Sequence, residues 1–577
     1  MEENKKTKNI KLTLYIIGIL CLMVGVSYAT YNLVLKGNKE HQVNIGSLTL
    51  KYEETNNINV TGDTLKTDEE GIASTNSFNF KVSVNNTTSK DVNYIVYLTM
   101  DEEYKANAKV GKVYLNNKTK NITYGPSFIT DLSKYKYTNS YVLCTNTFTS
   151  TTETHEYELK SWISATEARN ETDDTHETFL GGAVKFKVSV ETVETTNLDT
   201  SGANAPVLAS NMIPVYYDET NEVWKKADLA NTSIKEQWYS YESSGDKKGM
   251  WANAVTVTSS SRSKYLNASI GTAISMNDIT TMWVWIPRFN AVTPSNYNGG
   301  TQESPGAIDV TFVKQNETAI DAFTFGTKQL SGFWYGKFEI GGTLASSCTN
   351  ETCNVSNIVV KPNVSSLGSQ KVSSFFYASR SMEQPNNSFG FISSEVDTHM
   401  SKNNEWGAVA YLTHSIYGRC TSSTNCTEVG INNNSSYITG YGAPAGSDEN
   451  IANGTYDTTL GKDASTTKNI YGIYDMSGGS FEFVMGVYNK TIRYSGFSSL
   501  PDERYYNNYT TTSYKGHALN ETAGWYSDIV IFVDSSFPWV MRGGSYFDSA
   551  NAGVFSFYYD IGYSSSGYSS RLVISNE

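Results

Sequence analysis

The sequence predicts an exported, β-rich protein with an N-terminal transmembrane or signal helix, an all-β sandwich domain and a larger α+β domain. A mainly apolar run, residues 12–35, follows an N-terminal stretch that carries several lysines. Short segments of alternating apolar residues come next, and a tryptophan-rich region follows them. Because single cores usually stop growing at about 250–300 residues, a chain of 577 residues should contain two or three domains.

The apolar run is long enough to cross a membrane. As a helix at ~1.5 Å per residue it would span about 36 Å, more than the ~30 Å core of a bilayer. The lysines before it place the N-terminus inside and the rest of the chain outside. Ser27-Tyr28-Ala29 also resembles a signal-peptidase site. We therefore expect a cell-surface protein anchored through residues 12–35, or a secreted one if it is cleaved after Ala29.

Composition narrows the classes of partner. Charged residues make up 18% of the chain, aromatic residues 13%, and the formal net charge is −13. An acidic chain without a basic stripe would repel a phosphate backbone, so nucleic acid is not an expected partner. Two close cysteine pairs, Cys348 with Cys353 and Cys420 with Cys426, predict local disulfides of an oxidising compartment, with free thiols as the alternative.

The region from residue 42 to 193 has the pattern of an antiparallel sandwich. Apolar residues alternate along three segments, and turn-forming residues such as Asn85-Asn86 and Gly181-Gly182 separate them. The expected inward-facing residues are Phe78, Phe80, Val82, Val84; Tyr94, Val96, Leu98, Met100; and Val184, Phe186, Val188, Val190. Residues 194–207 read as a linker, and residues 1–36 as the anchor or signal segment.

A second domain is expected from residue 208 to 577. Its early tryptophans are expected in the core, because large aromatic side chains dominate cores; they are Trp224, Trp238, Trp251, Trp283 and Trp285. Met282–Arg288 and Gly332–Ile340 read as its first strands. The segment Glu405–His414 predicts a helix with Trp406, Val409, Ala410 and Thr413 on one face.

Near the C-terminus, residues 546–570 have an unusual composition. They include no Lys, Glu, Gln, Met or Trp and are rich in Tyr, Ser and Gly. Tyr offers large contact area at low rotamer cost, and Ser, Gly and Asn adapt their hydrogen bonds, as in evolved binding loops. The segment therefore predicts a ligand-contact surface, and an ordinary Tyr/Ser-rich strand closing a β-rich domain is the alternative.

The genetic code favours the binding interpretation. Every residue of 546–570 belongs to the set that an Asn codon (AAC or AAT) reaches when adenines at its first two positions are replaced. Residues outside that set, such as Lys, Glu and Gln, are common on ordinary surfaces. Their absence indicates a segment diversified at adenines.

Two spaced motifs carry a family resemblance. Asn469–Val484, which contains Gly478-Gly479-Ser480-Phe481-Glu482-Phe483, and Met541–Ser545 together resemble the G-L-Y-D-M-x-G-N-x-W-E-W-V … R-G-G-S-W pattern. That pattern belongs to the formylglycine-generating-enzyme-like (sulfatase-modifying factor) branch of the C-type lectin fold. With the Asn-codon segment, the chain resembles the variable target proteins of diversity-generating retroelements.

The resemblance implies a lectin-like domain that binds a protein or glycan ligand at the cell surface. The implied contact residues are Tyr546, Phe547, Asp548, Ser549, Asn551, Ser556, Tyr558, Tyr559, Asp560, Ile561, Tyr563, Ser564, Ser566, Tyr568 and Ser569. The implied scaffold frame is Gly478, Gly479, Glu482, Arg542, Gly543, Gly544 and Arg571. Glu482 is expected to hydrogen-bond the main chain or Arg542 beneath the binding face.

Departures from the pattern argue against an enzyme. The family's sulfatase-activating enzymes carry catalytic cysteines near the C-terminus, whereas the last cysteine here is Cys426. The histidines show no metal-binding spacing, and no nucleophile-elbow, phosphate-loop or dinucleotide motif is present. We expect no catalytic residue, metal or cofactor, and a formylglycine-generating-type enzyme remains the less favoured alternative.

The sandwich carries a second, shorter resemblance. Gly46–Leu50 after the apolar run, followed by Phe78–Val84, is similar to the camelysin and TasA-like exported proteins of Gram-positive bacteria. This resemblance implies a stalk domain that could self-associate by strand addition. A fixed surface adhesin or fibre subunit is therefore the alternative to a diversified receptor.

Overall fold

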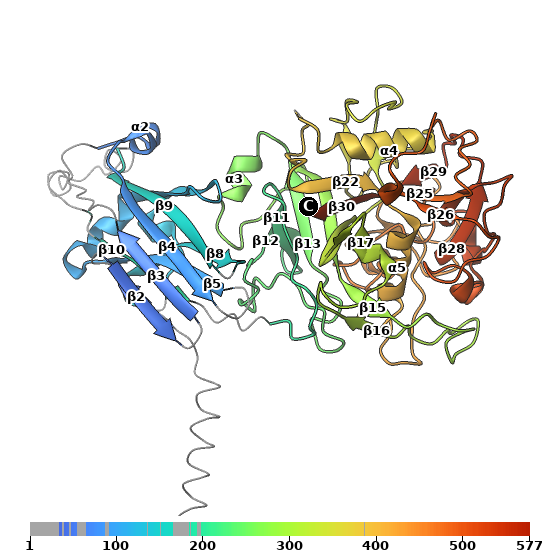
Figure 1. The fold of residues 1–577 in the computed structure, drawn as a ribbon, viewed down its shortest axis with the longest axis horizontal. Coiled ribbons are helices and arrows are strands. Elements are labelled where there is room, and N and C mark those ends of the chain that lie inside the picture. The colour runs from blue at the N-terminus through green and yellow to red at the C-terminus, as the bar shows by residue number, and fades with distance from the viewer. Residues whose placement is uncertain are drawn as a thin grey trace, which may run out of the picture. The chain divides into compact units, whose positions relative to one another are not determined.

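The chain folds into two compact units, residues 1–196 and 197–577. The computed structural model describes residues 34–36, 40–45, 48–54, 65–86, 92–135, 137–150, 152–165, 184, 186–192, 198–385 and 387–576. These residues are mostly β-structure with few helices (Figure 1). The division between the units falls inside the linker expected at residues 194–207.

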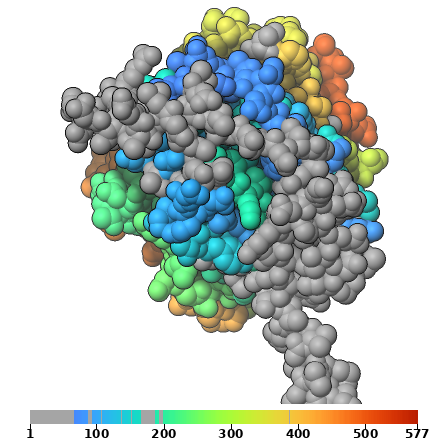
Figure 2. Space-filling model, turned by 90° about the vertical axis from the view of Figure 1, so that its left-hand side faces the viewer, coloured from blue at the N-terminus to red at the C-terminus, as the bar shows by residue number. Residues whose placement is uncertain are grey.

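The first unit contains two antiparallel sheets. Their strand orders are β1-β10-β5-β8 and β2-β3-β4-β9-β6-β7. The elements are β1 (Val34–Lys36), β2 (Glu40–Ile45), β3 (Leu48–Glu54), α2 (Asp68–Ala73), β4 (Phe78–Asn86), β5 (Val92–Met100), β6 (Gly111–Asn117), β7 (Ile122–Phe128), β8 (Ser140–Phe148), β9 (Thr152–Ile163) and β10 (Phe186–Thr192). Figure 2 shows the described surface of this unit in blue to cyan.

The two sheets share one hydrophobic core, as expected of a sandwich. The predicted inward faces of β4 and β5 are buried along their whole length. On β10, Val188 and Val190 are buried, and Phe186 is partly buried against the same core. The period-two alternation of these strands is therefore confirmed.

The predicted N-terminal helix falls largely outside the described residues. Its last two residues, Val34 and Leu35, lie in strand β1, which pairs with β10, so the helix cannot extend to residue 35 as expected. Among the helices of the described part of the chain, none has the length and apolar character needed to cross a bilayer.

The second unit is built on an antiparallel seven-stranded sheet. Its order is β12-β11-β13-β14-β19-β30-β22. The strands are β11 (Ile213–Asp218), β12 (Val223–Lys226), β13 (Asn253–Val257), β14 (Ile279–Pro287), β19 (Gly332–Gly336), β22 (Val396–Met400) and β30 (Leu572–Asn576). The predicted strands at 282–288 and 332–340 correspond to β14 and β19, but three strands precede them. The last strand of the chain lies between β19 and β22.

A smaller sheet carries the C-terminal segment. Its path is β26-β25-β27-β28, and β29 pairs with β25 in parallel. Its strands are β25 (Phe481–Tyr488), β26 (Asn507–Tyr509), β27 (Trp539–Gly543), β28 (Gly553–Asp560) and β29 (Tyr568–Ser570). Residues of both sheets belong to one hydrophobic core, in which the five expected tryptophans are buried.

Short helices and two-stranded ribbons complete the second unit. The helices are α3 (Arg262–Leu266), α4 (Val372–Ser381), α5 (Asn403–Thr413) and α6 (Thr459–Asp463). The paired ribbon strands are β15 (Phe289–Ala291) with β16 (Val310–Phe312), β17 (Thr324–Phe325) with β18 (Lys328–Gln329), β20 (Gly341–Gly342) with β21 (Ile358–Val359), and β23 (Tyr441–Gly442) with β24 (Gly454–Thr455).

Helix α5 confirms the predicted helix but not its amphipathic character. Every residue of α5 is buried, so the helix has no solvent-facing side. The indole Nε1 of Trp406 donates to the carbonyl of Val554 at 3.0 Å, which ties α5 to β28. A helix therefore packs beneath the sheet that carries the C-terminal segment.

The described part of the expected linker is not a free connection. The Nε1 of Trp285 donates to the carbonyl of Asn204 at 3.0 Å, and that of Trp334 donates to Val207 at 2.6 Å. Residues 198–207 thus pack on the second unit as its first segment. The composition predicted a linker because small and polar residues do not reveal which tryptophans they cover.

Candidate ligand-binding face

Both ends of the segment 546–570 are held in sheets. The segment follows β27, passes through the short 3-10 helix η9 (Ser549–Asn551) and strand β28, and returns through β29 to β30. β28 pairs with β27, β29 pairs with β25, and β30 lies inside the seven-stranded sheet. Tyr558, Tyr559 and Tyr568 therefore project from paired strands, and the other predicted contact residues that reach solvent lie in the short connections between strands.

Arg542 fixes the first of these strands. Its guanidinium is fully buried, and Nε donates to the carbonyl of Ser556 on β28 at 2.9 Å. Nη1 donates to Oδ1 of Asn403 at 3.0 Å, and Nη2 donates to the carbonyl of Ala518 at 2.9 Å. Burial lowers the pKa of Arg542 to about 10, so the side chain remains charged at neutral pH. It joins β27, β28 and α5 through charge-assisted hydrogen bonds.

Glu482 pairs with Arg571, which corrects the expected pairing with Arg542. Nε of Arg571 donates to Oε2 of Glu482 at 3.0 Å, and Nη2 donates to Oε1. Both side chains are fully buried, and burial raises the pKa of Glu482 to about 7 against the opposing effect of Arg571. Arg542 lies opposite Glu482 in the β25–β27 ladder, but its nitrogens bond carbonyls instead. The ion pair holds the end of the segment beneath the face.

Two glycine pairs shape the frame beside the segment. Gly478 and Gly544 adopt left-handed φ angles of 75° and 72°, and the other glycine of each pair is also left-handed. A Cβ on Gly478 would lie 2.5 Å from the carbonyl oxygen of Asn432, and one on Gly544 would lie 2.7 Å from Cα of Ala552. The Gly478 N–H donates to the carbonyl of Gly543 at 3.0 Å. Tight backbone packing is thus the role of these glycines.

Most of the predicted contact residues reach the surface. Those that are exposed or partly exposed are Tyr546, Phe547, Asp548, Ser549, Asn551, Tyr558, Tyr559, Ile561, Tyr563, Ser564, Ser566 and Tyr568. Ser556 and Ser569 are fully buried, and Asp560 is only 6% exposed. These three residues cannot contact a ligand in this structure, because their side chains are buried.

Half-exposed aromatic rings of the segment join rings from outside it in one chain of contacts, here called the aromatic band. Its members are Phe537, Tyr559, Tyr558, Phe481, Tyr568 and Tyr563. Tyr558 and Tyr559 stack with ring centroids 5.1 Å apart, and Phe537 lies 4.5 Å from Tyr559. Phe481 lies 5.8 Å from Tyr558 and 6.2 Å from Tyr568. Contacts between neighbouring rings stabilise their orientations.

A second aromatic group adjoins the loop before β29. Tyr546 meets Tyr437 and Phe547 edge-on, with ring centroids 5.2 Å and 5.3 Å away. Phe547 is 58% exposed. A Cβ on Gly567 would lie 2.8 Å from the hydroxyl of Tyr437, which places this group next to the return of the segment.

Three of these rings were not predicted as contacts. Phe481, Phe537 and Tyr437 lie outside 546–570, where composition offers no signal. Phe481 could have been found, because it stands where the family pattern has a tryptophan beside the frame glutamate. For Phe537 and Tyr437 the surrounding sequence does not show whether the ring lies at the surface or in the core.

The two carboxylates of the segment serve its own main chain. Oδ2 of Asp548 accepts from the Ser545 N–H at 2.8 Å, and Oδ1 of Asp560 accepts from the Gly562 N–H at 2.6 Å. Burial raises the pKa of both carboxyls. The exposed chemistry of the segment is therefore aromatic and hydroxylic, with little free charge.

The cysteines confirm the disulfide prediction. Cys348 bonds to Cys353 and Cys420 to Cys426, and Cys144 is free and buried. Among the described residues, one group of possible metal ligands comes together, His414 with Cys420 and Cys426. Because both sulfurs are in the disulfide, they offer no thiolate for a metal.

No protein-family model matches the sequence, and none of the curated proteins matches it. The function is therefore argued from the motifs and from the geometry of the face.

Proposed function

We propose that the protein is an exported, membrane-anchored surface receptor whose C-terminal unit presents a diversified ligand-binding face. In this proposal the unit has the C-type lectin fold of the formylglycine-generating-enzyme-like branch. A retroelement varies its segment 546–570, and the sandwich acts as a stalk. The ligand is a protein or a glycan outside the cell.

The observation that carries the proposal is the contrast between the frame and the segment. Arg542, Arg571 and Glu482 are fully buried, whereas Phe547 and Tyr563 are 58% and 44% exposed. A fixed main chain that displays Tyr, Phe and Ser combines low conformational cost with adaptable contacts. Such a face can change its ligand by changing side chains without losing its scaffold.

The chemistry of the face supports non-covalent binding to a macromolecule. Aromatic rings and hydroxyls dominate, and the segment's own carboxylates are engaged by main-chain N–H groups. Rings with a polar edge are enriched at interfaces, where they bury apolar area and keep a hydrogen-bond partner. A fixed adhesin or fibre subunit would share the fold but would not vary at these positions.

Replacing exposed rings tests the face directly. We expect Phe547→Ser with Tyr563→Ser to leave the thermal unfolding midpoint nearly unchanged, because surface substitutions usually change stability by about 0.5 kcal/mol or less. The same variant should lose at least tenfold in affinity, because aromatic anchors dominate interface energetics. The measurement is binding of the full-length chain to a glycan array and to arrayed bacterial surface proteins.

The matched control is Ile234→Ser, which replaces a side chain that is 77% exposed outside the segment. It should bind as the unchanged chain does. If the double variant kept full affinity for every probe that the unchanged chain binds, the aromatic residues of the segment would not be its contact surface.

A further inference from the structure

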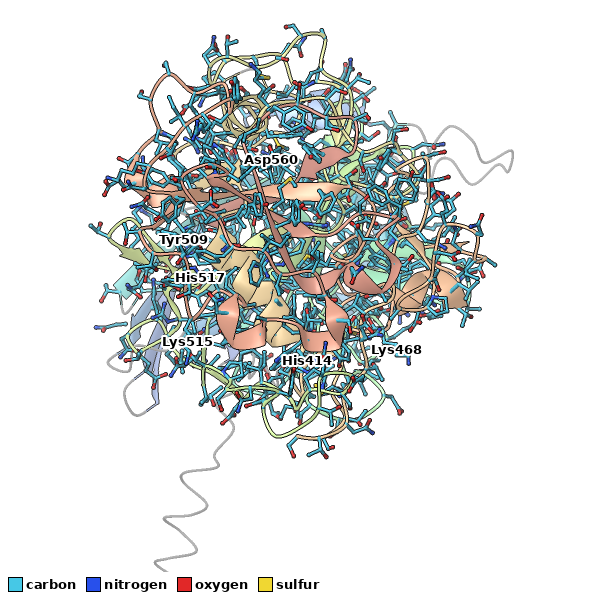
Figure 3. All side chains as sticks on the ribbon, turned by 90° about the vertical axis from the view of Figure 1, so that its right-hand side faces the viewer. His414, Lys468, Tyr509, Lys515, His517 and Asp560 are labelled. Carbon is cyan, nitrogen blue, oxygen red and sulfur yellow. A yellow bond between two sulfur atoms is a disulfide. The ribbon has the colours of Figure 1, made fainter. Side chains whose placement is uncertain are left out.

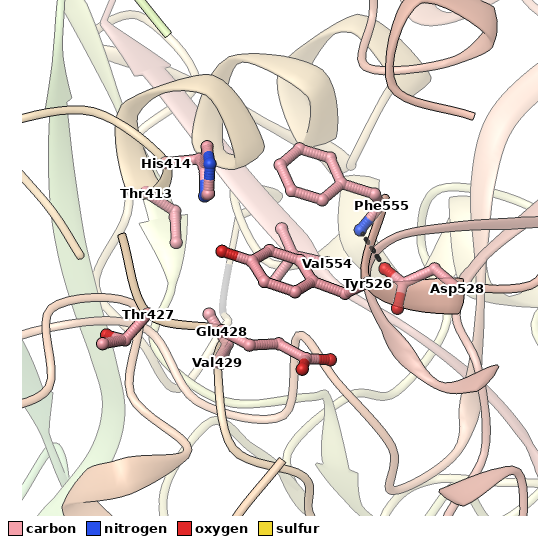
Figure 4. Close-up of a pocket in the computed structure, with 9 residues that line it drawn as sticks. All are labelled: Thr413, His414, Thr427, Glu428, Val429, Tyr526, Asp528, Val554 and Phe555. Carbon is pink, nitrogen blue, oxygen red and sulfur yellow. Dashed lines mark hydrogen bonds between the residues drawn. The ribbon is translucent and has the colours of Figure 1, made fainter. Parts of the chain in front are cut away.

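A small cavity lies in the second unit away from the aromatic band. It is lined by Thr413, His414, Thr427, Glu428, Val429, Tyr526, Asp528, Val554 and Phe555 (Figure 4). The accessible volume of the cavity is about 10 Å³, which is room for one water molecule or one ion. His414 at the cavity and Asp560 at the band are well separated in Figure 3.

Three buried oxygen atoms of the cavity lining have no hydrogen-bond partner among the described residues. They are Oε1 of Glu428, Oδ1 of Asp528 and the hydroxyl of Tyr526. Asp528 is only 3% exposed, and its other oxygen accepts from the Phe555 N–H at 2.9 Å. Buried polar atoms normally have partners, because a buried polar atom left unpaired destabilises the folded state. The unpaired oxygens of the two carboxylates indicate a missing partner, whereas the Tyr526 hydroxyl points toward His414 and away from them (Figure 4).

The charge around the cavity favours a positive partner. Burial raises the pKa of Glu428 to about 7, and burial with the nearby charge of Glu428 raises that of Asp528. Within the described residues, no cationic side chain lies within ion-pair distance of either carboxylate. Arg419 lies beside Glu428: its Nη2 donates to the main-chain carbonyl of Glu428, and its charge partly offsets the rise in the pKa of that carboxyl. Its Nη1 donates to the carbonyl of Ser465 at 3.2 Å, and its Nη2 also lies 3.6 Å from Asp463.

We propose that Glu428 and Asp528 form a binding site for one divalent cation of the hard, oxygen-preferring class. Two carboxylates balance the double charge, and carboxylate oxygens are preferred ligands of Ca²⁺ and Mg²⁺. Ca²⁺ is the first ion to test, because it tolerates irregular shells completed by carbonyls and water. The neutral imidazole of His414, whose pKa burial lowers to about 4, adds no competing charge.

Binding at this site would act on the variable segment. Asp528 contacts the main chain of β28 at two points: it accepts from Phe555, and a Cβ on Gly553 would lie 2.1 Å from its Oδ1. A cation that fixes the Asp528 carboxylate therefore fixes the start of β28. The site would support the scaffold and would not contact the ligand.

Calcium binding to the full-length chain tests the proposal. We expect calorimetric titration to show one equivalent bound and the unfolding midpoint of the second unit to rise with Ca²⁺. Glu428→Gln and Asp528→Asn, which keep the shape of each side chain, should each lower the affinity at least tenfold. Glu449→Gln, at an exposed acidic residue, should leave it unchanged. Glu428→Gln is the safer variant, because its carboxylate supports no main-chain hydrogen bond among those described.

Each outcome decides the proposal. Binding of Mg²⁺ in place of Ca²⁺, with the same loss in both variants, would support it. No bound Ca²⁺ or Mg²⁺ at up to about 10 mM, above the ~10⁻⁴–10⁻³ M range of extracellular calcium modules, would mean that the cavity holds water only. Equal binding by the unchanged chain and both variants, or binding of Zn²⁺ alone, would also overturn it.

Discussion

Neighbouring residues of the segment 546–570 differ sharply in how much of each side chain is exposed. Phe547 and Tyr563 are 58% and 44% exposed, whereas Ser556 and Ser569 are fully buried. A side chain that points into the frame cannot be exchanged freely, because interiors are close-packed. Only part of a diversified segment is thus free to vary without loss of the fold.

Gly553 is the clearest position that should resist change. A Cβ there would lie 2.1 Å and 2.2 Å from the two carboxylate oxygens of Asp528. We expect Gly553→Ala to destabilise the second unit by about 1–3 kcal/mol, the usual cost of overpacking. Asn551→Ala, at an exposed position of η9, should change stability by about 0.5 kcal/mol or less. Thermal unfolding of the two variants measures the difference, and equal midpoints would contradict the close packing of Asp528 on β28.

Strand β22 and helix α5 are joined by a buried charged histidine. Nδ1 of His399 lies 2.9 Å from Oδ1 of Asp397, and Nε2 lies 3.1 Å from Oε1 of Glu405. Burial by itself lowers the pKa of His399, but Glu405 and Asp397 outweigh it and raise the pKa to about 9. The imidazolium is therefore the form that links the two elements at neutral pH.

This link predicts a pH dependence of stability. The folded pKa of His399 is raised above the ordinary histidine value of 6.5, so its contribution to stability is fully present below pH 6.5 and is lost as pH rises through about 9. The amount lost should be on the order of 3 kcal/mol. Unfolding midpoints measured between pH 6 and about 10 should fall, and should fall less steeply in His399→Gln. Parallel profiles for the two proteins would show that His399 carries no such charge.

The period of apolar residues predicted the strands of the sandwich, because their apolar side chains alternate and face one shared core. The same reasoning predicted the position of α5 but missed its complete burial. A helix packed on all sides can carry polar residues such as Asn403 and Glu405, whose partners come from other elements. Strands β11 and β12 were missed as separate elements because their short apolar runs lie among tyrosines and charged residues.

The candidate face was only partly predictable. Composition located the segment, and the family pattern located Arg542, Arg571 and Glu482. The predicted partner of Glu482, Arg542, was wrong. Arg542 lies opposite Glu482 on the neighbouring strand, but the carboxylate forms its ion pair with Arg571. The cavity at Glu428 and Asp528 could not be predicted from the sequence, because the residues that line it come from segments far apart in the chain.

In the proposed function the first unit is a stalk and the second unit presents the binding face. The disulfides of the second unit fit the oxidising environment of an exported protein. The sandwich offers sheet edges such as β7 and β8, where an added strand could pair, as the fibre alternative requires. The receptor and the fibre subunit differ in one property, namely whether the exposed positions of 546–570 vary.

Sequencing the gene in many cells of one population measures that property. We predict substitutions at adenine-derived positions of codons 546–570, beside a near-identical template copy, and few in the flanking codons. They should concentrate at exposed residues such as Phe547, Tyr559 and Tyr563, and protein variants that persist should keep Gly553 and Ser556. A segment as invariant as its flanks, without a template copy, would contradict the diversified receptor and leave a fixed adhesin or fibre subunit.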